Sequence, residues 1–129
     1  MIRIRMSMDA LPIKSFTDLH AWKKSHSVVL LTYKITRSFP KEELFALTNQ
    51  MRRASVSAES NIAEGFGRNT LKDKQHFFCI AKGSLLELQS QSITAKDLGF
   101  MKIDDFNKME EELRHAIRLT AGLIRSANS

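Results

Sequence analysis

Few residues of this chain combine the types and the spacing that chemistry requires. A two-metal site inside a helical bundle uses a Glu-x-x-His pair on each of two helices. Glu112 and His115 have this spacing, but the 129-residue sequence holds no second copy of the pair with matching geometry. The other histidines, His20, His26 and His76, form no set with metal-ligand spacing. We therefore expect neither a metal ion nor another cofactor.

One carboxylate stands out because it lies within a mostly apolar stretch. Glu87 would need a second reacting group and a cleft to act as a general acid or base, and the sequence supplies neither. An antiparallel hairpin would bring Glu87 beside the segment that ends in Arg52 and Arg53. We predict a structural ion pair there, within one chain or between subunits, with the acid–base role as the alternative. No phosphate-binding glycine loop or nucleophile elbow is present, and the chain is predicted not to be an enzyme.

The remaining reactive side chain is a lone cysteine. Cys79 can form no internal disulfide and no Cys-rich metal site, and we expect a buried core thiol in a reducing cytoplasm. The longest apolar run is far shorter than the roughly 20 residues that cross a bilayer. The basic N-terminal segment 1–6 lacks the apolar run and cleavage site of a secretory signal. These features predict a cytoplasmic protein without a membrane span.

The composition fits one small helical domain. Hydrophobic residues make up 43% of the chain, which is enough for a core, and two prolines and five glycines leave room for long helices. The formal net charge is +6 and the sequence pI is about 9.7. This balance favours anionic partners, either nucleic acid or an acidic protein surface.

Four segments repeat apolar residues at the three- and four-residue spacing of an amphipathic helix. They run from about 17 to 38, 41 to 64, 70 to 98 and 103 to 125. The connections between them are short, so neighbouring helices should be antiparallel. We predict an all-α, up-and-down antiparallel four-helix bundle over residues 16–126. A flexible N-terminal arm (1–15) and a frayed tail (127–129) are expected on either side.

Residues that begin and end helices mark these boundaries. Thr17 and Thr70 are the predicted N-caps of the first and third helices. The second helix is expected to stop at Gly65 and Gly67, and the third at Gly99, because glycine commonly follows the end of a helix.

The first helix carries two apolar stripes. The leading stripe comprises Leu19, Trp22, His26, Val29 and Tyr33. Beside it lies a second, made of Val28, Leu31 and Ile35. A helix that is apolar on two faces is covered on both. One stripe should therefore face the bundle core and the other a subunit interface.

The second and fourth helices each have one predicted core face. That of the second comprises Leu44, Leu47, Met51, Ala54, Ala58 and Asn61, and that of the fourth Ile103, Phe106, Met109, Leu113, Ile117, Thr120 and Ile124. Asn61 needs hydrogen-bond partners on such a seam. It either fixes helix register or reads a ligand at the Gly65 loop. Glu64 either caps that turn or pairs with Arg68.

The segment from Phe39 to Ala54 reads FPKEELFALTNQMRRA, and it continues through Ser57, SNIAEG at 60–65 and Gly67-Arg68. It resembles the signature of a four-helix-bundle family encoded in intervening sequences of bacterial 23S ribosomal RNA genes. Residues 16–19 with Trp22 resemble the start of that family, and IAKGSLLEL at 80–88 resembles its third-helix motif. The resemblance covers roughly residues 16–124.

The resemblance implies an up-and-down bundle that assembles as a ring-shaped homopentamer. It also implies kinship with the accessory protein of diversity-generating retroelements, a basic pentameric barrel that binds a reverse transcriptase and contacts nucleic acid. It supplies no settled activity, and the family's name does not imply a ribosomal function. The residues to which we assign structural or motif roles are Trp22, Arg52, Arg53, Asn61, Glu64, Gly65, Gly67, Gly83 and Glu87.

Charge is unevenly distributed in the predicted topology. The first and third helices start, and the second and fourth end, at one end of the bundle, called here the basic pole. Its cations are Lys14, Lys23, Lys24, Arg68, Lys72, Lys74, Arg118 and Arg125, and the arm adds Arg3 and Arg5. Its acidic residues are Asp18, Glu59, Glu64 and Asp73. The pole is either a nucleic-acid-binding surface or a solvated basic end.

The leading functional hypothesis is a non-catalytic, homo-oligomeric accessory protein, pentameric by resemblance, that binds RNA or DNA electrostatically. The candidate contacts are Lys23, Lys24, Arg68, Lys72, Lys74, Arg118 and Arg125. The alternative is a protein-interaction scaffold that docks an acidic partner, such as a reverse transcriptase or another enzyme encoded beside it.

Overall fold

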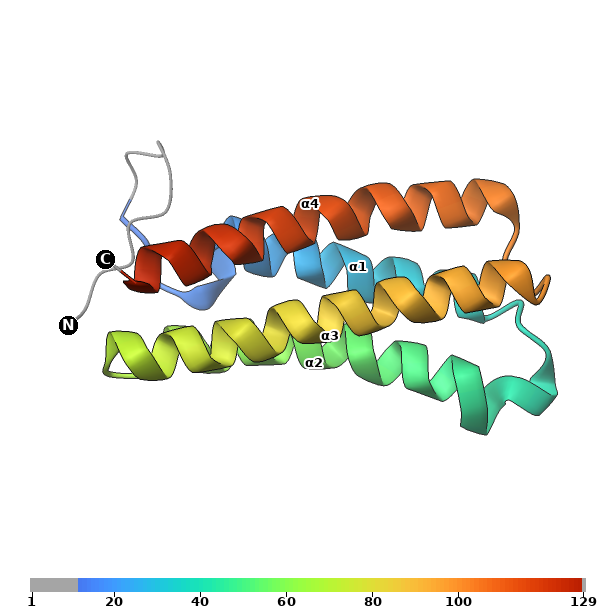
Figure 1. The fold of residues 1–129 in the computed structure, drawn as a ribbon, viewed down its shortest axis with the longest axis horizontal. Coiled ribbons are helices and arrows are strands. Elements are labelled where there is room, and N and C mark those ends of the chain that lie inside the picture. The colour runs from blue at the N-terminus through green and yellow to red at the C-terminus, as the bar shows by residue number, and fades with distance from the viewer. Residues whose placement is uncertain (1–11, 129) are drawn as a thin grey trace.

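The computed structural model describes residues 12–128, and the arm residues 1–11 with Arg3 and Arg5, together with Ser129, lie outside them. The four helices are α1 (His20–Thr36), α2 (Asn49–Phe66), α3 (Leu71–Asp97) and α4 (Ile103–Asn128), and the described part of the chain contains no strand. They run alternately up and down beside one another (Figure 1). Because α1 and α3 each pack mainly against α2 and α4, they occupy diagonal corners. The predicted all-α four-helix bundle is confirmed.

The first helix begins later than predicted. Ser15, not Thr17, is the capping residue, and it starts a short 3-10 turn, η1 (Phe16–Asp18). The Asp18 carboxylate accepts the backbone N–H groups of Lys14 (3.0 Å) and Ser15 (3.1 Å). These two hydrogen bonds, more than the nearby Lys23 charge, lower the pKa of Asp18. The prediction of Thr17 as N-cap is therefore wrong.

The boundaries of α3 agree with the sequence. The Thr70 hydroxyl accepts the backbone N–H of Asp73 at 3.1 Å, so Thr70 is the N-cap. Gly99 follows the helix with φ of 81°, the left-handed conformation that favours glycine at this position.

The second segment is irregular at its start. Two short turns, η2 (Lys41–Glu43) and the π-helical η3 (Leu44–Thr48), precede α2, with a kink at Ala46 (φ −121°, ψ −110°). Leu44 is consequently exposed rather than on the core seam, and the Phe45 side chain is 90% exposed. Figure 1 shows this segment projecting from the end of the bundle.

The end of α2 also differs from the prediction. The helix continues to Phe66 with Gly65 inside it, and Gly67 is the C-cap in a right-handed conformation (φ −80°). Gly65 is buried, so it serves packing and does not end the helix.

The core consists of two hydrophobic clusters. The larger one contains Val28, Ile35, Phe39, Met51, Ala54, Ala58, Leu85, Leu88, Ala95, Met101, Met109, Leu113 and Ala116. The smaller one, near the chain termini, contains Leu19, Ala21, Ile62, Phe78, Ala81, Leu123 and Ala127. The predicted frayed tail thus overlaps α4, since Ala127 is buried and the helix extends to Asn128.

The structure shows which stripe of α1 faces the core, and it corrects the predictions for Ile103 and Cys79. Of the two stripes of α1, the second faces the core through Val28 and Ile35. In the other, Trp22 and His26 are only half-buried and Tyr33 is exposed, although Leu19 and Val29 are buried. Ile103 is 59% exposed because it is the first residue of α4 and lies beyond the last turn of α3. Cys79 is also exposed and is not a core thiol. It lies on the outer side of α3.

Small residues of α2 allow this helix to pack closely against its neighbours. Ala58 is fully buried in the larger cluster. We expect Ala58→Leu to lower the free energy of unfolding by about 1–3 kcal/mol, because added methylene groups overpack a filled core. Ser60→Leu, at an exposed position of the same helix, is the control and should change stability little. Urea denaturation of both variants measures the difference. Equal stability of the two would place Ala58 outside the packed core.

Candidate nucleic-acid interface

The basic pole exists in the structure, since the starts of α1 and α3 and the ends of α2 and α4 meet at one end (Figure 1). Besides Arg68, four of the predicted contacts are exposed, namely Lys23, Lys72, Arg118 and Arg125. None of these four takes part in an ion pair with another described residue. Their charges are therefore available to an anionic ligand.

Lys74 is not part of this surface. Its side chain is buried (3% exposed), and its Nζ donates to the backbone oxygens of Phe66 (2.5 Å) and Gly65 (3.4 Å). The ammonium also lies 5.5 Å from the centre of the Phe66 ring. Desolvation on burial lowers the pKa of Lys74. The prediction of Lys74 as a nucleic-acid contact is wrong, because this lysine binds the carbonyl end of α2.

Two further predicted contacts are engaged within the chain. Arg68 lies 2.5 Å from Glu64 through Nη2 and Oε1, and its guanidinium stacks 4.4 Å from the centre of the Phe77 ring. The predicted Glu64–Arg68 pair is thus confirmed. Lys24 pairs with Glu112 of α4 at 2.8 Å. Both cations remain partly exposed, but their partners already neutralise them.

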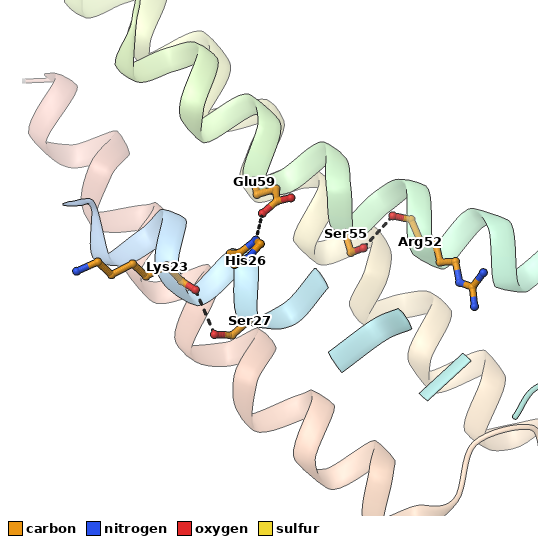
Figure 2. A network of polar contacts seen from close by, with 6 residues as sticks. All are labelled: Lys23, His26, Ser27, Arg52, Ser55 and Glu59. Atoms are coloured by element: carbon orange, nitrogen blue, oxygen red, sulfur yellow. Dashed lines mark hydrogen bonds and ion pairs between the residues drawn. The ribbon is translucent and has the colours of Figure 1, made fainter. Parts of the chain in front are cut away.

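A polar contact between His26 and Glu59 joins α1 to α2 near this end (Figure 2), and aromatic side chains surround it. His26 Nδ1 lies 2.7 Å from Glu59 Oε2, and the His26 ring stacks on Trp22 with centroids 4.8 Å apart. Phe16 meets the same Trp22 edge-on at 5.3 Å. The sequence did not predict the His26–Glu59 contact, because the two residues belong to different helices and no local spacing links them.

The predicted ion pair of Glu87 is absent within the described chain. Glu87 accepts a hydrogen bond from Gln91 at 3.3 Å. Arg52 instead donates from Nε to the Thr36 hydroxyl at 2.9 Å and covers the Tyr33 ring at 4.7 Å. Arg52 therefore ties α2 to α1 and does not reach α3. The exposed Arg53 also makes no ion pair with a described residue.

Asn61 lies at the edge of the α2–α3 contact and not in the core. It is half-buried, and its Nδ2 donates to the backbone oxygen (2.8 Å) and the hydroxyl (3.1 Å) of Ser57. The Ser57 hydroxyl in turn lies 2.9 Å from that of Ser84 on α3. This chain of hydrogen bonds supports the register role. Gly83, one residue earlier on α3, is exposed.

The surface offers little for small-molecule chemistry. Over residues 12–128, no group of three metal-ligating side chains comes together. An open hollow follows the outer side of α4, lined by Asn107, Glu110, Glu111, Arg114, His115 and Arg118. These residues belong to a single helix, so the hollow is not enclosed. No described helix is long and apolar enough to span a membrane.

The fold and the surface define a small four-helix-bundle protein with an exposed basic end. Residues 17–122 match the family described as 23S rRNA-intervening sequence protein, and the chain belongs to this family. The match runs from η1 into the last helix, so it includes α1, α2 and α3 in full and most of α4. No curated protein matches the chain.

Proposed function

We propose that this protein is a non-catalytic, homo-oligomeric accessory protein that binds nucleic acid through its basic pole. The observation that carries the proposal is a set of exposed cations that α1, α3 and α4 contribute to one end and that form no ion pair with a described residue, namely Lys23, Lys72, Arg118 and Arg125. Contacts of this kind neutralise phosphates, so binding should depend strongly on salt and weakly on sequence.

The neighbourhood of these cations supports this assignment. Two of the acidic residues near them are already engaged, Asp18 by backbone N–H groups and Glu64 by Arg68. Lys72 is the second residue of α3, where a cation opposes the helix dipole by a few tenths of a kcal/mol. The stability of α3 therefore does not account for a cation at Lys72. The buried Lys74 is different, because it stabilises the end of α2 through its hydrogen bonds to Gly65 and Phe66.

The test is a charge reversal that leaves the core untouched. In one variant Lys23, Lys72 and Arg125 are all changed to Glu. In the control the exposed Lys34, Lys41 and Lys102, near the opposite end, are changed to Glu, which alters net charge equally. Fluorescence anisotropy measures the affinity for mixed RNA and DNA oligonucleotides at several salt concentrations.

We expect the basic-pole variant to lose binding by orders of magnitude and the control to keep most of it. For the parent protein, log affinity should fall linearly with log salt, with a slope of roughly 0.7–0.9 per phosphate contact. An equal loss of affinity in both variants would mean that binding depends on the net charge of the protein and not on the basic pole. If the parent did not bind at low salt, the proposal would fail, and docking of an acidic partner protein would become the leading function.

A further inference from the structure

Aromatic side chains gather at the basic pole, in two pairs. In the α1 ring pair, Trp22 stacks on His26 with ring centroids 4.8 Å apart and an interplanar angle of 10°. In the α3 ring pair, His76 meets Phe77 at 5.2 Å with an interplanar angle of 78°. Both pairs lie within the first two turns of helices that start at the basic pole. This end of the bundle therefore presents flat rings as well as charge.

These rings are not enclosed in the core. His76 is exposed, and Trp22, His26 and Phe77 are half-buried. The neighbouring Phe78, by contrast, is fully buried and serves packing alone. Each ring pair therefore keeps part of its surface open to a ligand.

An exposed lysine accompanies each ring pair. Lys23 precedes His26 by three residues and Lys72 precedes His76 by four, so each lysine is the neighbour of a ring on its helix surface. Neither lysine forms an ion pair with a described residue. Figure 2 shows Lys23 directed away from Glu59, the carboxylate that contacts His26 Nδ1. The same arrangement, a partly open ring beside an exposed ammonium, thus occurs twice at this end.

A guanidinium extends the α3 ring pair. Arg68 lies over the Phe77 ring, 4.4 Å from its centre, and its side chain is 42% exposed. Pairing with Glu64 neutralises the charge of Arg68 but leaves this planar group partly open. Nucleic-acid bases stack on guanidinium planes as well as on aromatic rings. Arg68 therefore enlarges the stacking surface at Phe77 without adding an unpaired charge.

Rings beside cations suit one form of nucleic acid. In a single strand the unpaired bases can stack on protein rings while lysines neutralise the phosphates. In a duplex the bases already stack on one another, so the rings contribute little. A surface that acted by charge alone would favour the duplex, because duplex DNA carries more phosphates per unit length. The order of affinity for the two forms therefore distinguishes stacking from charge.

We infer that the basic pole binds single-stranded RNA or DNA, with bases stacked on the α1 and α3 ring pairs and phosphates neutralised by Lys23 and Lys72. This inference rests on the proposed function and adds the class of ligand, a strand with unpaired bases. It also assigns a role to the rings, which a purely electrostatic surface would not need.

The first test changes the ligand and leaves the protein as it is. Fluorescence anisotropy compares a labelled oligothymidylate of roughly 20 nucleotides, long enough to fill a single-strand site, with an abasic strand of equal length and with the oligothymidylate–oligoadenylate duplex. We expect the parent to bind the oligothymidylate at least about 10-fold more tightly than either comparison ligand. Oligouridylate and an abasic RNA, measured in parallel, show whether RNA or DNA is the preferred strand. Trp22 is the one tryptophan of the chain, so the oligothymidylate, but not the abasic strand, should quench the tryptophan fluorescence.

The second test removes rings without changing net charge. Trp22→Leu and Phe77→Leu should each lower the affinity for oligothymidylate about 5- to 100-fold and leave the affinity for the abasic strand and the duplex unchanged. Phe106→Leu is the matched control, because Phe106 is also half-buried with a cation, Lys96, 4.4 Å over its ring, but lies at the opposite end of the bundle. Circular dichroism confirms that each variant is folded, and the ligand comparison with the parent decides the question even if a variant does not fold.

The inference and the proposed function fail in different ways. Equal affinity of the parent for the oligothymidylate and the abasic strand would overturn the inference, and so would unchanged oligothymidylate binding by both folded leucine variants. Either result would leave the basic pole as a nucleic-acid surface that acts by charge alone. A parent that bound neither single strands nor duplex at low salt would refute the proposed function itself.

Discussion

Gly65→Ala is expected to lower the free energy of unfolding by up to about 2 kcal/mol. A Cβ at this position would lie 2.7 Å from Cε1 and 2.8 Å from Cδ1 of Phe78, and 3.1 Å from Cβ of Phe77. Phe78 is fully buried, so its ring has no room to move away. The cost is that of overpacking a filled core, typically 1–3 kcal/mol, and it outweighs the gain in helix propensity of about 1 kcal/mol.

The matched control is Gly122→Ala in α4. A Cβ there would meet only the Arg125 guanidinium at 3.7 Å, an ordinary van der Waals distance. This variant should gain about 0.5–1 kcal/mol, because alanine costs less backbone entropy than glycine within a helix. Thermal and urea unfolding measure both. Gains of similar size in the two variants would show that α2 and α3 can separate at Gly65.

The parts of the fold that the sequence predicted well depend on local signals. Thr70 and Gly99 bound α3 because a capping hydroxyl and a left-handed glycine act within one turn of the helix end. The start of α2 was predicted wrongly because the π-helical turn at Leu44–Thr48 holds an extra residue. That residue moves Leu44 off the helix face that carries Met51. A prediction that assumes a constant three- and four-residue spacing places both residues on the same face.

The sequence left open which stripe of α1 faces the core. The buried side of this helix includes Thr32 and Thr36, which a hydrophobic pattern counts as polar. Their hydroxyls donate to the carbonyls of Val28 and Thr32, both at 2.7 Å, so burial leaves neither group unpaired. The half-buried aromatic stripe looked more apolar, although it lies towards α2 and the solvent.

The sequence predicted where the basic pole lies, but not which of its cations are exposed and without an ion pair to a described residue. Topology alone places cations at that end of the bundle, and no local rule shows which of them find partners. Lys74 is the exception, because it precedes Phe78 by four residues and Ala81 by seven, on the core seam of α3. A lysine on that seam would have indicated a buried partner, here the carbonyl groups that end α2.

Lys74→Glu is expected to be the most damaging single change, lowering the free energy of unfolding by about 3–5 kcal/mol. The new carboxylate would be buried against the backbone oxygens of Gly65 and Phe66, so like charges would meet without solvent. Lys74→Met keeps the apolar stem but leaves those oxygens unpaired, which should cost about 1–3 kcal/mol. Lys72→Glu, two residues earlier and exposed, is the matched control and should stay within about 0.5 kcal/mol of the parent.

The pH dependence separates this role from simple packing. Desolvation holds the pKa of Lys74 in the folded protein below its ordinary value of 10.5. The unfolded chain therefore binds more protons between the folded and unfolded pKa values, and stability rises with pH across that interval. Below the folded pKa, Lys74 is protonated in both the folded and the unfolded chain, so the gain in stability from its deprotonation is absent. The stability of the parent relative to Lys74→Met should accordingly increase as pH rises towards 10.5, as measured by urea unfolding in alkaline buffers. A constant difference between the two proteins across that range would mean that Lys74 stays solvated and that its contact with the end of α2 is not maintained in solution.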